Sequence, residues 1–453
     1  MFINRARPTH AARTIVRKRL TAASALFLAF AVQGLAGAQQ STSPGRLRLA
    51  DLYAQVERAN PRVAAAQALS DAVRARVPAA RRPPDPQLQL GFMNYSLPGL
   101  APMPTLGMSQ LQLMQMLPLG GKLHAAGRAA DARASSSAER ARDVVWETRA
   151  AAAMGFYDLY AVDGQLDVAR ETVRLLQDVE RTAQSMYRVG EGRQADVLRA
   201  QVEIARMAED TLRMRAMRAT MVARLGALLD RDVTLEIGRA ILPHFPDSLP
   251  ARASLDTIAS TGRPMIRAGI EDVRSAEASQ TLARREIWPD LQLGVVYGQQ
   301  GSEMGTERMG SLMLGASLPV FARDRQLRMR EETAAMTRMA QAELAAMRAD
   351  TRGRIGEAYA SLERARTLST LYRSTVLPQT EATAASALAA YRVGGVDFMT
   401  LLDDRMTVNR YRQQLYALDA DQGKAWAELE MLVGRELFDP QQAPAMVGTR
   451  GTR

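Results

Sequence analysis

The 453-residue sequence contains no cysteine, 5% aromatic residues and only three histidines, of which His124 and His244 lie outside the N-terminal region. Without cysteine the chain can form no disulfide bond, carry no lipid on an N-terminal cysteine and use no thiol nucleophile. Two histidines far apart in the sequence argue against a zinc site or a histidine base, and no glycine loop of the phosphate-binding type is present. The composition therefore predicts neither an enzyme nor a bound cofactor.

Only one long hydrophobic run is present, and it lies near the N-terminus. Six basic residues precede the apolar stretch 20–35, and the sequence Ala-Gly-Ala at 36–38 has the small residues of a cleavage site. Residues 1–38 are predicted to be a secretory signal peptide, with the mature chain starting near Gln39. The remaining sequence has no apolar run long enough for a membrane-spanning helix, so any span of a membrane falls to β-strands.

The positive charge of the chain lies partly in this leader. The formal net charge is +11, and loss of six basic and no acidic residues leaves +5. The remaining basic residues are dispersed along helical tracts instead of forming a patch, as solvated helix faces do. An exported chain with this pattern is not expected to bind nucleic acid. The alternative of a cytosolic, basic coiled coil that binds nucleic acid applies only if the leader is retained.

Most of the chain has the pattern of long helices. From Lys122 to Tyr187 there is almost no proline, and about 65 helical residues would reach about 100 Å, a length typical of coiled coils and helical barrels. A second helix runs to about Leu229. Its apolar and small residues recur at steps of three and four, the spacing of a coiled-coil seam: Leu198, Val202, Ala205, Leu212, Ala216 and Ala219.

Between the helical tracts lie four segments with a period of two, which predicts β-strands. They are about 86–96, 109–117, 290–298 and 311–320. Each has about ten residues, the length that crosses a bilayer when tilted. The segments that join each pair, LPGLAPMPTLG and QQGSEMGTER, contain proline and glycine and fit hairpin loops.

The order of these elements occurs twice. Each half reads helix, strand, loop, strand, long helix, a Tyr-Arg-Val-Gly turn and a second helix. We predict a first repeat at 39–241, with a helical hairpin over 122–229. The second repeat at 242–453 contains a hairpin over 322–433 and a C-terminal tail. A proline-bearing linker, LPHFPDSLPAR, begins at Leu242.

Four strands per chain cannot close a transmembrane barrel, because open sheet edges in lipid leave backbone groups unpaired. The smallest such barrels have about eight strands. Several copies of the chain must therefore each donate four strands, and a trimer with twelve is the simplest solution.

The sequence resembles the TolC-type outer-membrane efflux protein family over essentially the whole mature chain. The resemblance rests on the duplicated layout, the segment LYAQVERANPRVAAAQ from Leu52, the segment LPLGGKL from Leu117 and the two YRVG turns. The resemblance implies a mainly α fold with a β-barrel part. Three chains would form a homotrimer with a 12-stranded barrel in outer-membrane lipid and a long periplasmic α-helical barrel. It also implies two partners, a periplasmic adaptor and an inner-membrane efflux pump, in a Gram-negative bacterium.

In that family the turns that match Val189-Gly190 and Val393-Gly394 lie at the periplasmic tips and contact the adaptor. Acidic residues just beyond the second tip ring the closed end of the tunnel. An ungapped count from Gly394 places Thr400 at the first of these positions and Asp403 at the second. The resemblance thus implies a pore constriction, with these members: Asp403, Asp404, Thr400 and, from the first half, Asp196.

Methionines fall in or beside the strands in the register opposite the leucines: Met93, Met108, Met114, Met116, Met309 and Met313. If the leucines face lipid, the thioethers face the lumen, where soft sulfur ligands suit Cu(I) or Ag(I). The LPLGGKL segment is similar to members of the family's heavy-metal efflux branch. The alternative is that methionine merely fills the barrel interior.

The function predicted from these observations is an outer-membrane channel subunit that passively conducts drugs or metal ions delivered by the pump. One alternative is an outlet for type I protein secretion. A periplasmic coiled-coil scaffold is another; it would explain the helices and the leader but not four alternating strands of bilayer length.

Overall fold

The computed structural model describes residues 46–96, 98–99, 101–103, 107–231, 237–302 and 305–438. The chain divides into two compact units, and the larger one, Arg46–Leu235 with Arg239–Arg453, contains all helices and strands of these residues. The predicted signal peptide, the C-terminal tail beyond Phe438 and residues 232–236, which precede the linker, lie outside the described part of the chain.

The helices and strands follow one another in the same order in both halves, which confirms the internal duplication. The first half contains α2 (Leu49–Ala59), α3 (Pro61–Ala75), α4 (Val77–Ala80), β1 (Gln87–Met93), β2 (Tyr95–Ser96), β3 (Ala101–Pro102), β4 (Met108–Leu117), α5 (Lys122–Arg188) and α6 (Gln194–Leu228). The second half contains α7 (Arg252–Gly262), α8 (Pro264–Arg285), β5 (Leu291–Ser302), β6 (Gly305–Ala316), α9 (Gln326–Leu371), η2 (Tyr372–Val376), α10 (Leu377–Arg392) and α11 (Phe398–Val433).

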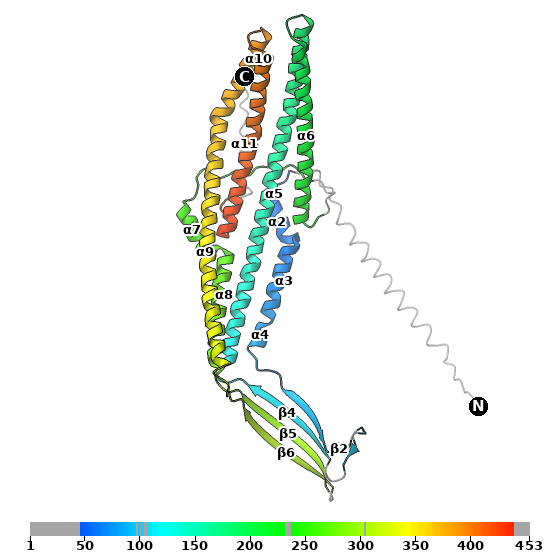
Figure 1. Cartoon of the computed structure of the whole chain (residues 1–453), viewed down its shortest axis with the longest axis vertical. Coiled ribbons are helices and arrows are strands. Elements are labelled where there is room, and N and C mark those ends of the chain that lie inside the picture. Colours follow the sequence, from blue (N-terminus) through cyan, green and yellow to red (C-terminus); the bar gives the residue numbers. More distant parts are fainter. Residues whose placement is uncertain are drawn as a thin grey trace, which may run out of the picture. The chain divides into compact units, whose positions relative to one another are not determined.

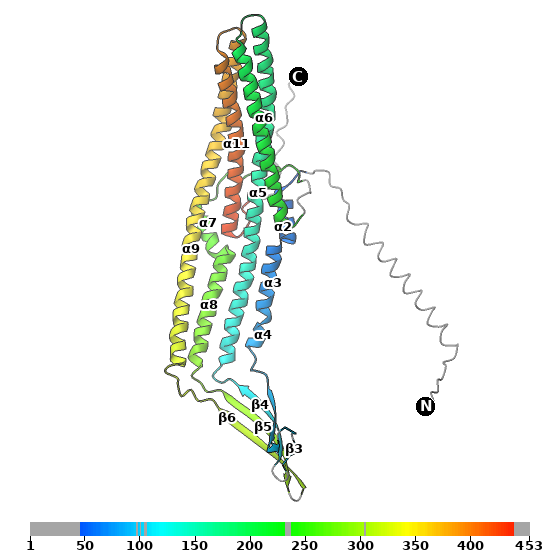
Figure 2. The ribbon, with the colours of Figure 1, turned by 45° about the vertical axis from the view of Figure 1, so that its right-hand side comes forward.

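The helices of the larger unit run side by side, and the sheet follows at one end of them (Figures 1 and 2). Helix α5 is continuous over 67 residues, or about 100 Å at 1.5 Å per residue. Its counterpart in the second half is interrupted by the π-helix η2. Pro378 follows η2 and cannot donate a backbone hydrogen bond, and its ring excludes the usual position of the Ser374 carbonyl. Among the described helices, none combines the length and hydrophobicity required to cross a bilayer.

The four main strands form one antiparallel sheet in the order β1-β4-β5-β6. The two hairpins therefore lie next to each other, because β4 of the first half pairs with β5 of the second from Met108–Gln300 to Leu117–Leu291. Strands β1 and β6 each have one partner, so one edge of each is open. The sheet consequently presents two edge rows of backbone groups that no other strand in the described part of the chain pairs.

The strands depart from the sequence-based bounds at three points. Asn94 has a positive φ of 54° and ends β1, after which β2 pairs with β3 in a separate two-stranded sheet. The segment QQGSEMGTER was expected to be a loop, but β5 continues to Ser302 and β6 begins at Gly305. A ladder depends on backbone pairing, which polar side chains do not prevent. At the other end β6 stops at Ala316, and the following helix begins only at Gln326, beyond Pro319.

The pairing register shows which strand residues share a face of the sheet. Leu88 pairs with Leu113, Leu113 with Val295, and Val295 with Leu312, so one face is rich in leucine and valine. Gln87 pairs with Met114, Met114 with Gly294, and Gly294 with Met313 on the opposite face. By the same register all six methionines singled out in the sequence share that second face with glutamine and glycine.

The predicted seam of α6 does not pack within the chain. Leu198, Val202 and Leu212 are 53%, 51% and 63% exposed. The face of α6 that meets the other described helices instead carries Val197, Ala200, Met207 and Thr211, all buried. The sequence pattern predicted a packing surface, but no other described residue covers this face of α6, so its role in packing stays a prediction.

Two close approaches hold α5 against α11. At each, a glycine of one helix lies under a tyrosine ring of the other. A Cβ at Gly164 would lie 2.2 Å from Tyr416, and a Cβ at Gly423 would lie 2.3 Å from Tyr157. Tyr157 is fully buried, so its ring has little room to move away.

We expect Gly423→Ala to lower the free energy of unfolding by about 1–3 kcal/mol, the usual cost of overpacking a core. Gly353→Ala is the matched control, because Gly353 lies in α9 with no atom within 4 Å of a new Cβ. Alanine should stabilise that helix by up to about 1 kcal/mol. Thermal unfolding of the two variants checks the direction of both stability changes. Equal melting temperatures of the two variants would contradict the close packing of Gly423 against Tyr157.

Candidate functional site: the paired helical tips

The two YRVG segments form the turns at the ends of the helical hairpins α5–α6 and α10–α11, which lie together in both views (Figures 1 and 2). In the first turn the amides of Glu191 and Gly192 both donate to the Met186 carbonyl, at 3.0 Å. In the second, the Gly395 amide donates to the Ala390 carbonyl at 2.8 Å. These bonds satisfy carbonyls that a helix end leaves unpaired.

Each turn places a left-handed glycine directly after an exposed valine. Gly190 and Gly394 have φ of 82° and 72°, a conformation that costs other residues free energy. Val189 is 68% exposed and Val393 is 83% exposed. The predicted adaptor-contacting residues are thus two apolar side chains on rigid turns, which nothing in the described chain covers.

The two tips share one hydrophobic core. Leu176 and Val197 of the first hairpin cluster with Tyr391, Phe398 and Leu401 of the second. The rings of Tyr391 and Phe398 meet edge to face at a centroid distance of 5.9 Å, a favourable arrangement. This cluster joins the two tips into one packed unit.

The two copies of the turn differ in burial. Tyr391 is 6% exposed, whereas its counterpart Tyr187 is 46% exposed. Burial raises the pKa of Tyr391, and the negative charge of Asp196 acts in the same direction, which places Asp196 of the first tip beside the second. Asp196 is half-buried in the first turn of α6, where the helix dipole stabilises a carboxylate.

Thr400 has a local role in the structure. Asp397 precedes α11, and its carboxylate accepts bonds from the Thr400 amide at 2.9 Å and from the Thr400 hydroxyl at 2.5 Å. These bonds, with a smaller contribution from the charge of Arg193, lower the pKa of Asp397. Thr400 thus takes part in the N-terminal cap of α11. Its predicted place in a pore constriction stays a prediction.

Asp403 and Asp404 lie one turn further along α11. Asp403 is exposed and Asp404 is half-buried. Within the described residues neither carboxylate has a cationic partner within 4 Å. Their predicted place in a constriction stays a prediction, to which the exposed Asp403 is better suited than the half-buried Asp404.

Further along α11, Arg412 connects both hairpins. Its Nη1 donates to Glu171 of α5 at 3.0 Å, and its Nη2 donates to Glu381 of α10 at 2.6 Å. Next to it, the buried Thr172 hydroxyl donates to Asn409 Oδ1 at 3.1 Å. These polar bonds hold the inner helix α11 to the helices on both sides of it.

Two methionines of the second face of the sheet flank Gly294. Met114 and Met313 lie on the strands on either side, and a Cβ at Gly294 would lie 3.6 Å from Met114 and 3.3 Å from Met313. The missing side chain leaves space above Gly294 into which both thioethers can lean. Among the described residues, no group of three or more histidine, cysteine, aspartate or glutamate side chains could hold a metal ion.

Sequence reasoning missed three residues of this site: Tyr391 as a core residue, Asp397 as a cap and Arg412 as a bridge. Asp397 had a readable signal, because Asp-x-x-Thr before an apolar run is typical of a helix start. Arg412 had none, because its two carboxylate partners lie 31 and 241 residues away in the sequence.

A family model described as outer membrane efflux protein matches residues 52–231 and 258–435, one segment for each repeat. Among curated protein sequences, none is significantly similar to the chain.

Solved structures of similar fold cover nearly the whole chain. CusC, solved in a study of folding and transmembrane channel formation, is 17% identical, with a TM-score of 0.74 over 88% of this chain and 96% of that one. The outer membrane protein VceC of Vibrio cholerae is 15% identical, with a TM-score of 0.72 over 86% and 96%. The CmeC outer membrane channel of Campylobacter jejuni is 13% identical, with a TM-score of 0.72 over 89% and 92%. At these identities the likeness establishes the fold.

Proposed function

Because the chain belongs to the outer membrane efflux protein family, a family of channels and not of enzymes, we propose that three copies of it form one channel through the outer membrane of a Gram-negative bacterium. The long helices extend into the periplasm. There the channel receives small substrates from an inner-membrane pump through an adaptor, and conducts them passively to the exterior.

The observation that carries this proposal is the four-stranded sheet with two open edges. The edge strand β6 has 12 residues, and the outer edges of β6 and of β1 pair with no other strand of the described residues. In lipid such groups must be paired, and the edges of further copies can pair them. Three copies contribute twelve strands, more than the minimum of about eight.

The exposed seam of α6 supports assembly of the helical part as well. An apolar stripe along a helix that no other element of the described chain covers is typical of a protein interface. Small residues such as Ala205, Ala216 and Ala219 on the seam allow a neighbouring helix to approach closely. The stripe lies on the same hairpin as the first tip, so assembly would also bring the tips of the copies together.

The tip valines are proposed to bind the adaptor. We expect Val189→Asp with Val393→Asp to abolish efflux in cells, because each aspartate would have to lose its hydration on docking. Single-channel conductance of the purified protein should stay unchanged. Val393→Leu, which keeps an apolar side chain, is the control and should retain efflux. Normal efflux by the double aspartate variant would contradict the docking role.

Asp403 is proposed to select ions where the copies converge. With Asp404 and Asp196 nearby, several carboxylates would surround one axis and favour cations. We expect Asp403→Asn to lower the cation-to-anion permeability ratio in planar bilayers severalfold. The control Asp421→Asn removes a charge from the same helix at a site already paired with Lys424. If both variants keep the native ratio, Asp403 does not line the constriction.

Soft metal ions are a second candidate cargo, favoured by the methionines that the register places on one face of the sheet. Thioethers are suitable ligands for Cu(I) and Ag(I). Replacement of all six with leucine should lower the tolerance of cells to copper and silver, whereas Met336→Leu with Met339→Leu on α9 should not. Unchanged tolerance of the sixfold variant to copper and silver would contradict a role in metal transport and would mean that these methionines only pack the barrel interior.

A further inference from the structure

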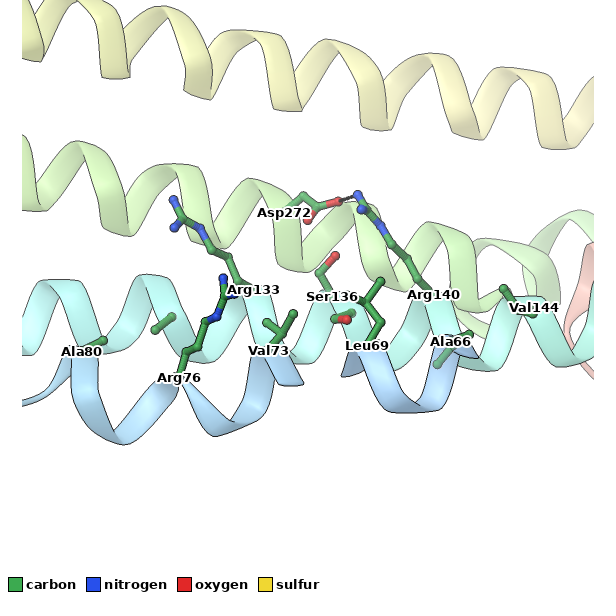
Figure 3. A pocket seen from close by; sticks show the side chains of 13 residues that line it. Ala66, Leu69, Val73, Arg76, Ala80, Arg133, Ser136, Arg140, Val144 and Asp272 are labelled. Atoms are coloured by element: carbon green, nitrogen blue, oxygen red, sulfur yellow. Dashed lines mark hydrogen bonds and ion pairs between the residues drawn. The ribbon is translucent and has the colours of Figure 1, made fainter. Parts of the chain in front are cut away.

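A cavity of about 540 Å³ lies between α3, α5 and α8, away from both tips and from the strands. Figure 3 shows it from close by, with side chains of the three helices around it. Its volume lies in the range of small-molecule binding sites. Neither the proposed docking surface nor the constriction explains it.

The apolar part of the cavity comes from one face of α3. Ala66, Leu69 and Val73 are three and four residues apart, so they point the same way, toward α5 (Figure 3). Leu69 is exposed. Opposite them, α5 contributes the small residue Ala141 and the branched Val144, and the small side chain leaves the space open.

The polar part carries an excess of positive charge. Arg76, which follows α3, and Arg133 and Arg140 of α5 line the cavity together with one acidic residue, Asp272. Arg140 Nη2 pairs with Asp272 Oδ2 at 2.7 Å. Arg133 donates from Nε to the Ser275 hydroxyl at 3.2 Å, but neither it nor Arg76 has a carboxylate within 4 Å among the described residues. Figure 3 shows the side chain of Arg76 extending toward Arg133.

A buried serine also lines this space. Ser136 lines the cavity and is 2% exposed. Its Oγ has no hydrogen-bond partner in the described structure. A buried hydroxyl that is left unpaired costs stability; this Oγ is itself shielded from solvent, so it adds no ligand contact.

We propose that the cavity binds an amphiphilic anion, with its apolar body against Leu69, Val73 and Val144 and its carboxylate, sulfonate or phosphate between Arg76 and Arg133. Two guanidinium groups without a carboxylate partner, next to an apolar wall, suit such a ligand and disfavour a cation of the same shape. The site belongs to the isolated protein and does not require the efflux function. Free amphiphiles and anionic phospholipids share this chemistry.

The test uses the full chain in nanodiscs of zwitterionic phosphatidylcholine and a decanoate that carries a terminal diazirine. Photolabelling, followed by mass spectrometry of the peptides, should place the label in 66–80 and 130–144. Arg76→Gln with Arg133→Gln should raise the apparent Kd about tenfold, the loss expected from two exposed ion pairs. Arg74→Gln, an exposed arginine of α3 outside the cavity, should leave the Kd unchanged.

Two further measurements do not depend on the stability of a variant. Higher salt should weaken labelling of the unmodified protein, because exposed ion pairs are screened. The decylammonium analogue should not label these peptides. Competition by phosphatidylglycerol in the disc would identify a lipid as the natural ligand; competition by unlabelled decanoate alone would identify free amphiphiles.

Three results would overturn the proposal. The first is labelling that is confined to other parts of the chain, and the second is equal labelling by the ammonium probe. The third is a double arginine variant whose copies no longer associate but whose labelling is unchanged. The last result would show that the surface is a contact between subunits.

Discussion

Unpaired backbone groups at the edges of the β1-β4-β5-β6 sheet are the constraint on which the account of this protein depends. Buried amides and carbonyls need hydrogen-bond partners wherever water is absent. The chain supplies partners for its two inner strands and for one side of β1 and of β6. In the proposed channel further copies supply the rest, so the closed barrel, a covered seam of α6 and the grouping of the tips would all follow from assembly.

The two halves of the chain repeat the same layout, but they differ in structural detail. The first half has the unbroken helix α5 and an exposed Tyr187, whereas the second has the π-helix η2 and a buried Tyr391. The second tip is also capped by Asp397, while the residue before α6, Arg193, makes no side-chain cap. The second hairpin therefore has the more closely constrained tip, next to Asp403.

Much of this fold could be predicted because its signals are local. Alternation with a period of two marked the strands, and long stretches without proline marked the helices. The continuation of β5 and β6 through a glycine-containing segment could not be predicted from the sequence, because it depends on hydrogen bonds between the two strands. The same holds for the buried face of α6 and for Arg412, whose partners come from distant segments. At the tips, the sequence predicted the turns with their left-handed glycines but not the burial of Tyr391.

Cross-linking between the open sheet edges tests the central claim most directly, because the native chain has no cysteine. Gln89 of β1 and Ser311 of β6 lie on the outer strands and on the same face. The variant Gln89→Cys with Ser311→Cys, treated with a flexible bis-maleimide in the membrane, should give a denaturing-gel ladder that ends at three copies. Each single-cysteine variant should stay free of the three-copy band. A double variant that remains monomeric, or that forms a ladder without an end, would contradict a closed barrel made of three chains.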